Sequence, residues 1–127
     1  MIRKKGIIMK PCEVVAYKGK KIIIVDISSS TPEKISPFLE DAQRKIATFP
    51  LKSALVLTDV TGAVYDKVTS DAMKSFSANN TPYVKASAVV GADGVRSVLM
   101  TTIAILTRRE IKSFKDRTQA LDWLESV

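Results

Sequence analysis

The sequence predicts a single α/β domain whose mixed, mainly parallel β-sheet carries an N-terminal β-hairpin and alternating helices. Residues 54–57 form an unbroken apolar run bounded by Thr58, Asp59 and Gly62, which is typical of a strand buried on both faces between helices. Segments of strand and helix character then alternate along the chain in the order β-β-α-β-α-β-α-β-α. The 127 residues suffice for one compact domain and are too few for two.

The first two strands are expected at residues 13–17 and 21–27, which are rich in Val and Ile. A short link, Lys18-Gly19-Lys20, joins them, and its glycine suits a tight turn. An antiparallel hairpin at one side of the sheet follows from this pattern.

Two starts are open for the first helix. Ser30 and Glu33 have the spacing of a capping box, and Thr31 before Pro32 is an equally good beginning. Both place the start of the helix directly after the hairpin.

The body of this helix carries a single apolar stripe and contains one proline, Pro37, which is unfavourable inside a helix. Pro37 should either kink the first turns or delay the regular helix until near Ser36, and Pro50 should end it. The stripe consists of residues at helical spacing: Ile35, Phe38, Leu39, Ala42, Ile46 and Phe49.

A second helix and a further strand follow Gly62. The helix is expected over residues 65–76, with its apolar face made by Val68, Ala72, Met73 and Phe76. The strand is expected at residues 84–90 and closes at Gly91.

A third helix opens at Gly94 and is apolar more than halfway round. Its inner face is expected to consist of Val95, Val98, Leu99, Thr102, Ile103 and Leu106, while Met100, Ala104 and Ile105 lie off that stripe. Such a helix is either deeply buried by the fold or covers a pocket or a second subunit, and we expect burial. Homodimerisation through its outer side or through the hairpin stays open.

The last elements are a short strand at residues 110–114 and a helix capped by Asp116 with Gln119 three residues on. The core side of this helix is expected to be Ala120, Leu121, Trp123, Leu124 and Val127.

Composition and the start of the chain predict a soluble cytoplasmic protein. Hydrophobic residues make up 46% and charged residues 26%, an ordinary globular balance. The single Cys12 excludes an internal disulfide and fits a reducing compartment. Residues 1–10 form a basic arm ahead of a domain over residues 11–127, and their apolar patch is too short for a signal peptide. No run approaches the length of a transmembrane segment.

The net charge of +7 arises from 20 basic and 13 acidic residues. The basic residues are scattered along the sequence, no expected helix gathers them on one face, and aromatic residues do not interleave with them. We therefore expect a solvated basic surface and no nucleic-acid partner.

The residues give little support for catalysis, a metal or a cofactor. The chain has no histidine, a single cysteine, no Walker loop and no Gly-x-Gly-x-x-Gly. Asp26, Asp59 and Asp93 lie at expected strand ends, where paired carboxylates could act in acid–base chemistry but capping is the expected role. Residues 91–94 could present N–H groups to an anion, although glycine there commonly just permits a turn.

Three motifs carry a family resemblance. Residues 55–62 (LVLTDVTG), 82–91 (PYVKASAVVG) and 120–124 (ALDWL) resemble the STAS-like (SpoIIAA-like) bacterial family, which is related to the antagonists of anti-sigma factors. The likeness runs from about Glu13 to the C-terminus. It implies a mixed sheet with alternating helices and a non-enzymatic regulatory protein. Such proteins bind a protein partner, or sometimes a nucleotide or lipid.

The resemblance also singles out Thr61. The antagonists carry Asp-Ser-Ser-Gly after the central strand and are phosphorylated on the second serine, and here Asp59-Val60-Thr61-Gly62 places Thr61 at that position. A hydroxyl at a helix entrance is well placed to carry phosphate. Val60 departs from the family pattern, and the alternative is that Asp59 and Thr61 only cap the turn.

Two functional hypotheses result. The first is a regulatory binding domain that docks a protein partner through the loop after the central strand, with Thr61 as a phosphorylation switch. The second is a small carrier or sensor of a lipid or other apolar ligand, which needs a cavity of several hundred Å³ beside residues 95–106. The expected binding surface consists of Thr58, Asp59, Thr61, Gly62, Tyr65, Asp26, Ser28, Gly91 and Gly94.

Overall fold

The computed structural model describes residues 12–64, 66–108 and 110–127, except for the side chains of residues 95, 96 and 106. The basic arm expected at residues 1–10 and the binding residue Tyr65 therefore lie outside the described residues. The strands are β1 (Cys12–Tyr17), β2 (Lys20–Asp26), β3 (Ala54–Asp59), β4 (Val84–Val90) and β5 (Ile111–Phe114). The helices are α2 (Pro32–Ile46), α3 (Lys67–Asn80), α4 (Gly94–Thr107) and α5 (Arg117–Ser126).

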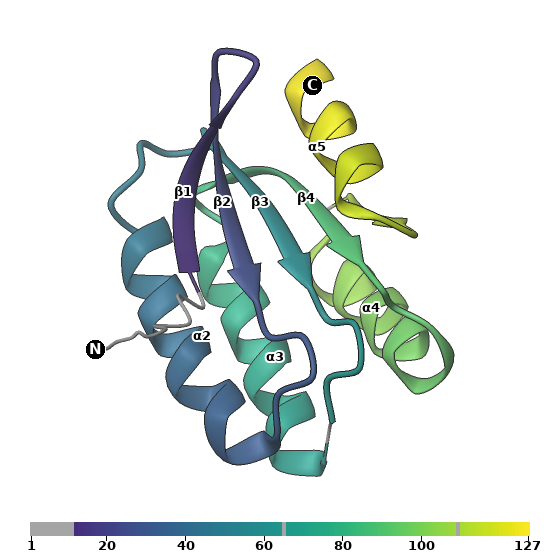
Figure 1. Ribbon diagram of the computed structural model, residues 1–127. Coiled ribbons are helices and arrows are strands. Elements are labelled where there is room, and N and C mark those ends of the chain that lie inside the picture. Colours follow the sequence, from purple (N-terminus) through teal and green to yellow (C-terminus); the bar gives the residue numbers. More distant parts are fainter. Residues whose placement is uncertain (1–11, 65, 109) are drawn as a thin grey trace, which may run out of the picture.

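The five strands form one sheet in the order β1-β2-β3-β4-β5 (Figure 1). β1 and β2 are antiparallel, and the pairs β2–β3, β3–β4 and β4–β5 are parallel. Lys18 and Gly19 both have positive φ, 50° and 86°, which is the conformation that a two-residue hairpin turn requires. The α/β fold class, the strand and helix order and the hairpin are confirmed.

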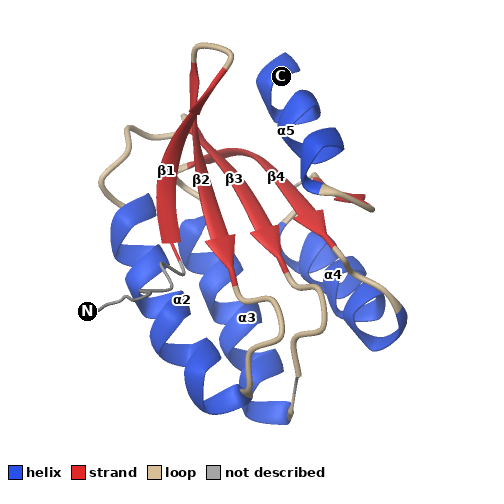
Figure 2. Cartoon of the chain, viewed as in Figure 1, coloured by secondary structure: helices blue, strands red, loops and turns tan. Residues whose placement is uncertain are grey.

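Helices cover both faces of the sheet (Figure 2). α2, α3 and α4 lie on one face, and α5 is the described helix on the other. Every residue of β3 is buried, with Val56 in the core beneath the three helices and Leu55 and Leu57 in the core beneath α5. The central strand is thus shielded on both faces, as its composition predicts.

The start of α2 decides between the two expected beginnings. Thr31 is the N-cap residue and Pro32 is the first helical residue, so the Thr31-Pro32 start is correct. The capping box is wrong, because the Ser30 hydroxyl donates to the carbonyl of Ser28 instead. The delayed start near Ser36 is also wrong, because α2 runs through Pro37.

Two expected helix faces need correction. Val68 in α3 and Val98 in α4 were assigned to the core, but they are 70% and 67% exposed. Met100, expected off the stripe, is buried with Leu99 and Ile103. The physical reason is that α4 is apolar nearly all round, so its hydrophobic pattern does not determine which side turns to the sheet. Val68 is the second residue of its helix, where the chain is only beginning to meet the core.

α5 is held at both ends. At its N-terminus, the side chain of Asp116 accepts a hydrogen bond from the Gln119 N–H at 2.9 Å, so the expected cap is confirmed. Farther along, Asp122 accepts hydrogen bonds from the Tyr17 hydroxyl at 2.5 Å and from Lys18 Nζ at 3.1 Å, both from the hairpin. The second half of α5 therefore lies beside the hairpin, at the amino ends of the parallel strands (Figure 1).

Candidate functional site

The candidate site lies where β2 and β3 end. Asp26 and Asp59 are the last residues of these strands and are direct partners in the parallel ladder. The loops that follow are also joined, because the Ile27 N–H donates to the carbonyl of Asp59 at 3.0 Å. Two carboxylates from neighbouring strand ends are thereby brought side by side, as expected from parallel pairing.

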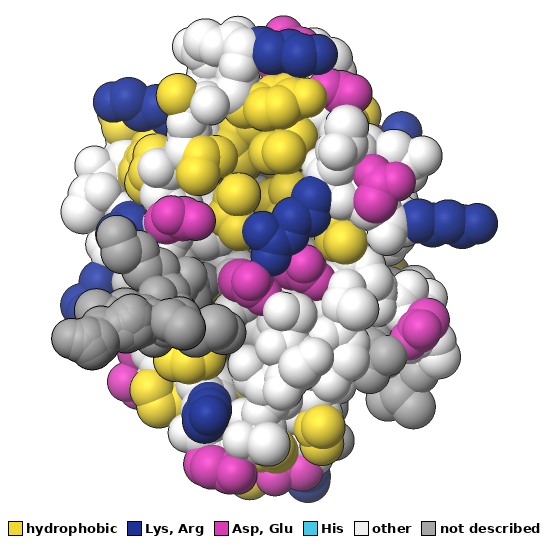
Figure 3. All heavy atoms as spheres, in the orientation of Figure 1, with side chains coloured by type: hydrophobic (Ala, Val, Ile, Leu, Met, Phe, Trp, Pro, Cys, Tyr) yellow, Lys and Arg dark blue, Asp and Glu magenta, His cyan; other side chains and the backbone are white. Residues whose placement is uncertain are grey.

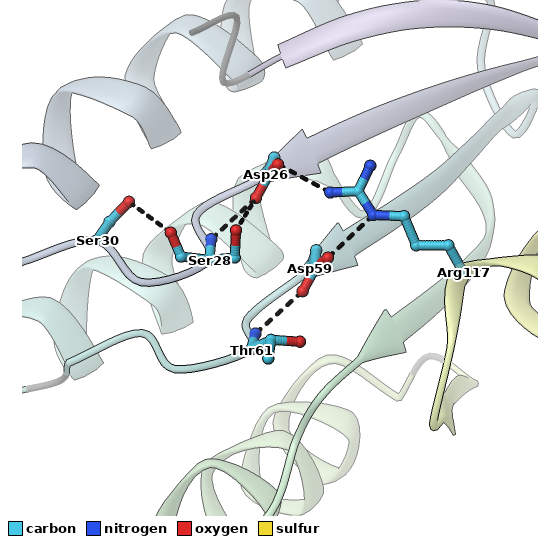
Figure 4. Close-up of polar contacts among 6 residues, drawn as sticks. All are labelled: Asp26, Ser28, Ser30, Asp59, Thr61 and Arg117. Carbon is cyan, nitrogen blue, oxygen red and sulfur yellow. Dashed lines mark hydrogen bonds and ion pairs between the residues drawn. The ribbon is translucent and has the colours of Figure 1, made fainter.

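Arg117 joins the two carboxylates (Figure 4). Its Nη2 donates to Asp26 Oδ2 at 2.8 Å and its Nε donates to Asp59 Oδ2 at 2.9 Å. The three side chains are 29%, 11% and 39% exposed for Asp26, Asp59 and Arg117, so this aspartate–arginine cluster is partly shielded from water. Because Arg117 is the first residue of α5, the cluster also anchors that helix over the sheet.

The second oxygen of each carboxylate organises its own loop. Asp26 Oδ1 accepts hydrogen bonds from the backbone N–H of Ser28 at 3.0 Å and from its hydroxyl at 2.5 Å. Asp59 Oδ1 accepts from the backbone N–H of Thr61 at 3.0 Å. Both are turns closed by an aspartate two residues before the donor. The expectation that these aspartates cap helices is therefore wrong, since they cap the turns that leave the sheet.

These contacts shift the pKa values of Asp26 and Arg117. Burial alone would raise the pKa of Asp26, but the hydrogen bonds from Ser28 and the guanidinium of Arg117 outweigh it and leave the pKa below its ordinary value. Burial would lower the pKa of Arg117, and its bonds to Asp59 and Asp26 raise it instead. An ionised carboxylate bound to a permanent cation has no proton to give, so this arrangement holds structure in place rather than supplying a general acid.

Thr61 is exposed although its backbone is fixed. Besides the bond to Asp59, its carbonyl accepts from the Ser29 N–H at 2.8 Å. On its other side Thr61 packs against Gly91, where a Cβ would lie 2.8 Å from the Thr61 Cα. Gly91 also has φ +82°, so both its backbone and its neighbour require glycine. The result is an exposed hydroxyl residue on a corner that is held from three sides.

The other expected binding residues lie in three different settings. Ser28, Gly62 and Gly91 lie with Thr61 on the loops at this end of the sheet, and Gly62 approaches Ser29 so closely that a Cβ would lie 3.2 Å from its hydroxyl. Thr58 is buried at 8% exposure and lines an internal cavity, so it is not part of the surface. Gly94 begins α4, and a Cβ there would meet nothing within 4 Å.

Thr61 does not lie at a helix entrance. α3 begins at Lys67, and its N-cap is Asp66, whose side chain accepts from the Thr69 N–H at 2.8 Å. Residues 61–64 lie between the end of β3 and the N-cap of α3. This connection and the first turn of α3 carry two exposed apolar side chains, Val64 at 54% and Val68 at 70% exposure.

Arg117 is the functional residue that sequence reasoning missed. It lies 58 residues from Asp59 and 91 residues from Asp26, so no local pattern links them. A signal was present nonetheless. Two carboxylates predicted at adjacent strand ends need a cation, and Arg117 follows the last strand at the head of a helix.

Within the described ranges, no group of three or more His, Cys, Asp or Glu side chains is arranged to hold a metal ion. None of the helices described has the length and apolar character to cross a bilayer. The cavity lined by Thr58 and by Met100 and Ile103 of α4 measures about 30 Å³, whereas ligand pockets measure about 300–1,000 Å³. This cavity gives no support to the carrier hypothesis.

The fold has a counterpart among solved structures. It is similar to the crystal structure of an uncharacterised protein of the DUF3478 family with a SpoIIAA-like fold from Shewanella loihica PV-4, at a TM-score of 0.71 and 16% sequence identity. The match covers 89% of this chain and 91% of that one. No protein-family model matches the sequence, and no curated protein matches it either. The chain therefore has the SpoIIAA-like fold that its three motifs implied.

Proposed function

We propose that the protein is a non-enzymatic regulatory module that docks a protein partner through the corner formed by the loops after β2 and β3. The observation that carries this proposal is the exposure of Thr61 on a backbone held by Asp59, Ser29 and Gly91. A surface that is already ordered loses little entropy when a partner binds it. Val64 and Val68 supply apolar contact area on the segment that follows.

Phosphorylation of Thr61 would act on this corner by repulsion. A phosphate adds between one and two negative charges, and it would lie beside Asp59, whose carboxylate accepts from the Thr61 N–H. Arg117, the cation that bonds to Asp59, is already shared between Asp59 and Asp26. The added charge would therefore loosen the corner and release a partner bound to the unmodified form, which gives the fold an off-switch.

The first experiment compares partner binding by three proteins. Affinity capture followed by mass spectrometry identifies partners of the wild type, and titration calorimetry with the purified partner then measures each variant. Thr61→Glu should weaken binding at least about tenfold, as expected when a charge is buried unpaired in an interface. Thr101→Glu adds the same charge at an exposed position on α4 and should bind like the wild type. Equal binding by the wild type and Thr61→Glu would contradict docking at this corner.

The switch has a separate test. The protein is incubated with ATP and extract of the native host, and phosphorylated peptides are mapped by mass spectrometry, with Thr61→Ala as the control. Phosphate on Thr61 that lowers affinity for the purified partner supports the off-switch. A partner that binds the phosphorylated form more tightly would reverse its direction, and exclusive phosphorylation at other residues would remove Thr61 from it.

A further inference from the structure

The basic residues that are scattered in sequence are gathered by the fold. Each of the four parallel strands begins beside a Lys or an Arg, and because the strands are parallel, these starts lie at the same edge of the sheet. We call this group the basic edge, and its members are Lys20, Lys21, Lys52, Lys85 and Arg108. It lies at the end of the sheet opposite the aspartate–arginine cluster.

Two adjoining surface grooves show that these side chains are neighbours. One groove, of about 310 Å³, is lined by Lys20, Lys21 and Lys85 together with Phe49. The other, of about 280 Å³, is lined by Lys52, Lys85 and Arg108 together with Glu110. Lys85 lies in both grooves, so the five cations form one continuous surface that Glu110 only partly neutralises.

Most of this charge is available to a partner. Lys20 Nζ donates to the main-chain oxygen of Val127 at 2.8 Å, and Lys52 Nζ donates to the carbonyl of Thr81 at 3.4 Å, which is a neutral acceptor. Within the described part of the chain, Lys21, Lys85 and Arg108 form no ion pair. The edge therefore carries a net positive field at close range.

The backbone at this edge gives a second, independent observation. Lys18, Lys52 and Arg108 have φ of 50°, 58° and 54°, a left-handed conformation that glycine adopts more easily. Lys52 and Arg108 belong to the basic edge, and Lys18 lies in the neighbouring hairpin turn, where it pairs with Asp122. Glycine would fit all three positions with less strain. Charge at these turns is thus present against the local backbone preference.

An exposed apolar residue, Leu51, is the chain neighbour of Lys52 in the basic edge. Leu51 is 70% exposed and precedes Lys52 in a turn that is closed by the Ser53 hydroxyl donating to the carbonyl of Pro50 at 2.7 Å. An exposed apolar side chain next to a cationic surface matches an anionic lipid bilayer, because the cations meet headgroups while the apolar tip enters the acyl boundary. A nucleic acid would instead favour an exposed aromatic platform, and Phe49 is half-buried against the core.

We propose that the basic edge is a docking surface for an anionic membrane, with Lys20, Lys21, Lys52, Lys85 and Arg108 on the headgroups and Leu51 inserted at the interface. The protein docks as a peripheral protein and leaves the corner at Thr61 on the side away from the bilayer. This surface is separate from the corner of the proposed function, and neither proposal depends on the other.

The test is flotation of the whole protein with lipid vesicles. Vesicles of phosphatidylcholine containing about one third phosphatidylglycerol should carry the protein at about 0.15 M salt and lose it at about 0.5 M, whereas pure phosphatidylcholine should not carry it. Lys21→Glu with Lys85→Glu should lower binding at least about tenfold. Lys34→Glu with Lys115→Glu gives the same net charge at exposed positions away from the edge and should bind nearly as the wild type does.

A second pair of variants tests the insertion. Leu51→Ser should lower vesicle binding about three- to tenfold. Ile105→Ser, also at a residue that is 70% exposed, should leave it unchanged. Equal losses in the two charge-reversed doubles would overturn the proposal, since total charge and not the edge would then matter. So would tighter binding to a single-stranded oligonucleotide or to polyglutamate that Leu51→Ser does not affect, because the partner would then be a nucleic acid or an acidic protein.

Discussion

The two ends of the sheet are built in opposite ways. At the carboxyl ends of the strands, charges of both signs are paired, partly buried and tied to the loops, as the contacts of Arg117 with Asp26 and Asp59 show. At the amino ends, five cations and one carboxylate, Glu110, line open grooves, and three of the cations form no ion pair within the described residues. The charged side chains at the carboxyl ends stabilise the loops of the protein itself, whereas those at the amino ends face the solvent. Figure 3 shows the first arrangement, where an apolar band on the face of the molecule ends at a group of acidic and basic side chains.

The largest expected difference between the two ends concerns their glycines. Gly91→Ala should lower the free energy of unfolding by about 3 kcal/mol, because the new Cβ meets the Thr61 backbone and the residue keeps a positive φ. Gly19→Ala, at φ +86° in the hairpin turn with nothing within 4 Å, should cost only about 1 kcal/mol. Urea denaturation of both variants measures the difference. Equal losses would show that backbone strain alone matters and that the contact between Thr61 and Gly91 adds nothing.

The charged side chains should differ almost as much. Arg117→Met leaves Asp26 and Asp59 without their cation and should cost about 2 kcal/mol, which is below the value for a fully buried pair because the arginine is 39% exposed. Lys85→Met removes a cation that has no ion-pair partner among the described residues and should change stability by less than about 0.5 kcal/mol. Arg44→Met tests an exposed pair with Asp41 and should resemble Lys85→Met. A loss at Arg44 as large as that at Arg117 would remove the distinction.

Low pH should weaken the aspartate–arginine cluster at the carboxyl ends of the strands. The pKa of Asp26 in the folded protein lies below its ordinary value, so the unfolded chain binds this proton first. The stabilisation is therefore fully present above about pH 4, the ordinary pKa of an aspartate, and is lost as the pH falls through the folded pKa. Urea titrations at several pH values should show a decline that is shallower in Asp26→Asn. An NMR titration that places the Asp26 pKa above that of a free aspartate would contradict this account.

Salt should produce the smallest effect. Raising the salt concentration screens the repulsion among the cations of the basic edge, and stability should rise by about 0.5 kcal/mol between dilute and about 0.5 M salt. Lys21→Gln combined with Lys85→Gln should be more stable at low salt and gain less from added salt. A wild type that loses stability in salt would indicate that the attraction within the aspartate–arginine cluster outweighs the repulsion at the basic edge.

Local patterns were enough to predict the strands, the hairpin and the positions of Asp26 and Asp59, because parallel neighbours bring their ends together whatever the connections between them. They were not enough for Arg117, whose contact depends on how α5 lies across the sheet. The basic edge was missed for a related reason, since its members are spaced along the chain by the intervening helices and align only through the sheet. The prediction of which face of α4 turns inward was wrong at Val98 and Met100. A helix that is apolar more than halfway round can turn several faces inward.

The position of α5 has a consequence for how the molecule assembles. Its bond from Tyr17 to Asp122 joins residues 105 apart, and Ala120 and Leu124 complete an apolar layer with Ile22 and Leu57 from the middle of the sheet. That layer forms only when the chain has closed a long loop, so we expect it to form after the local hairpin. Detachment of α5 would expose this apolar face of the sheet to solvent, and exposed apolar sheet surfaces promote aggregation.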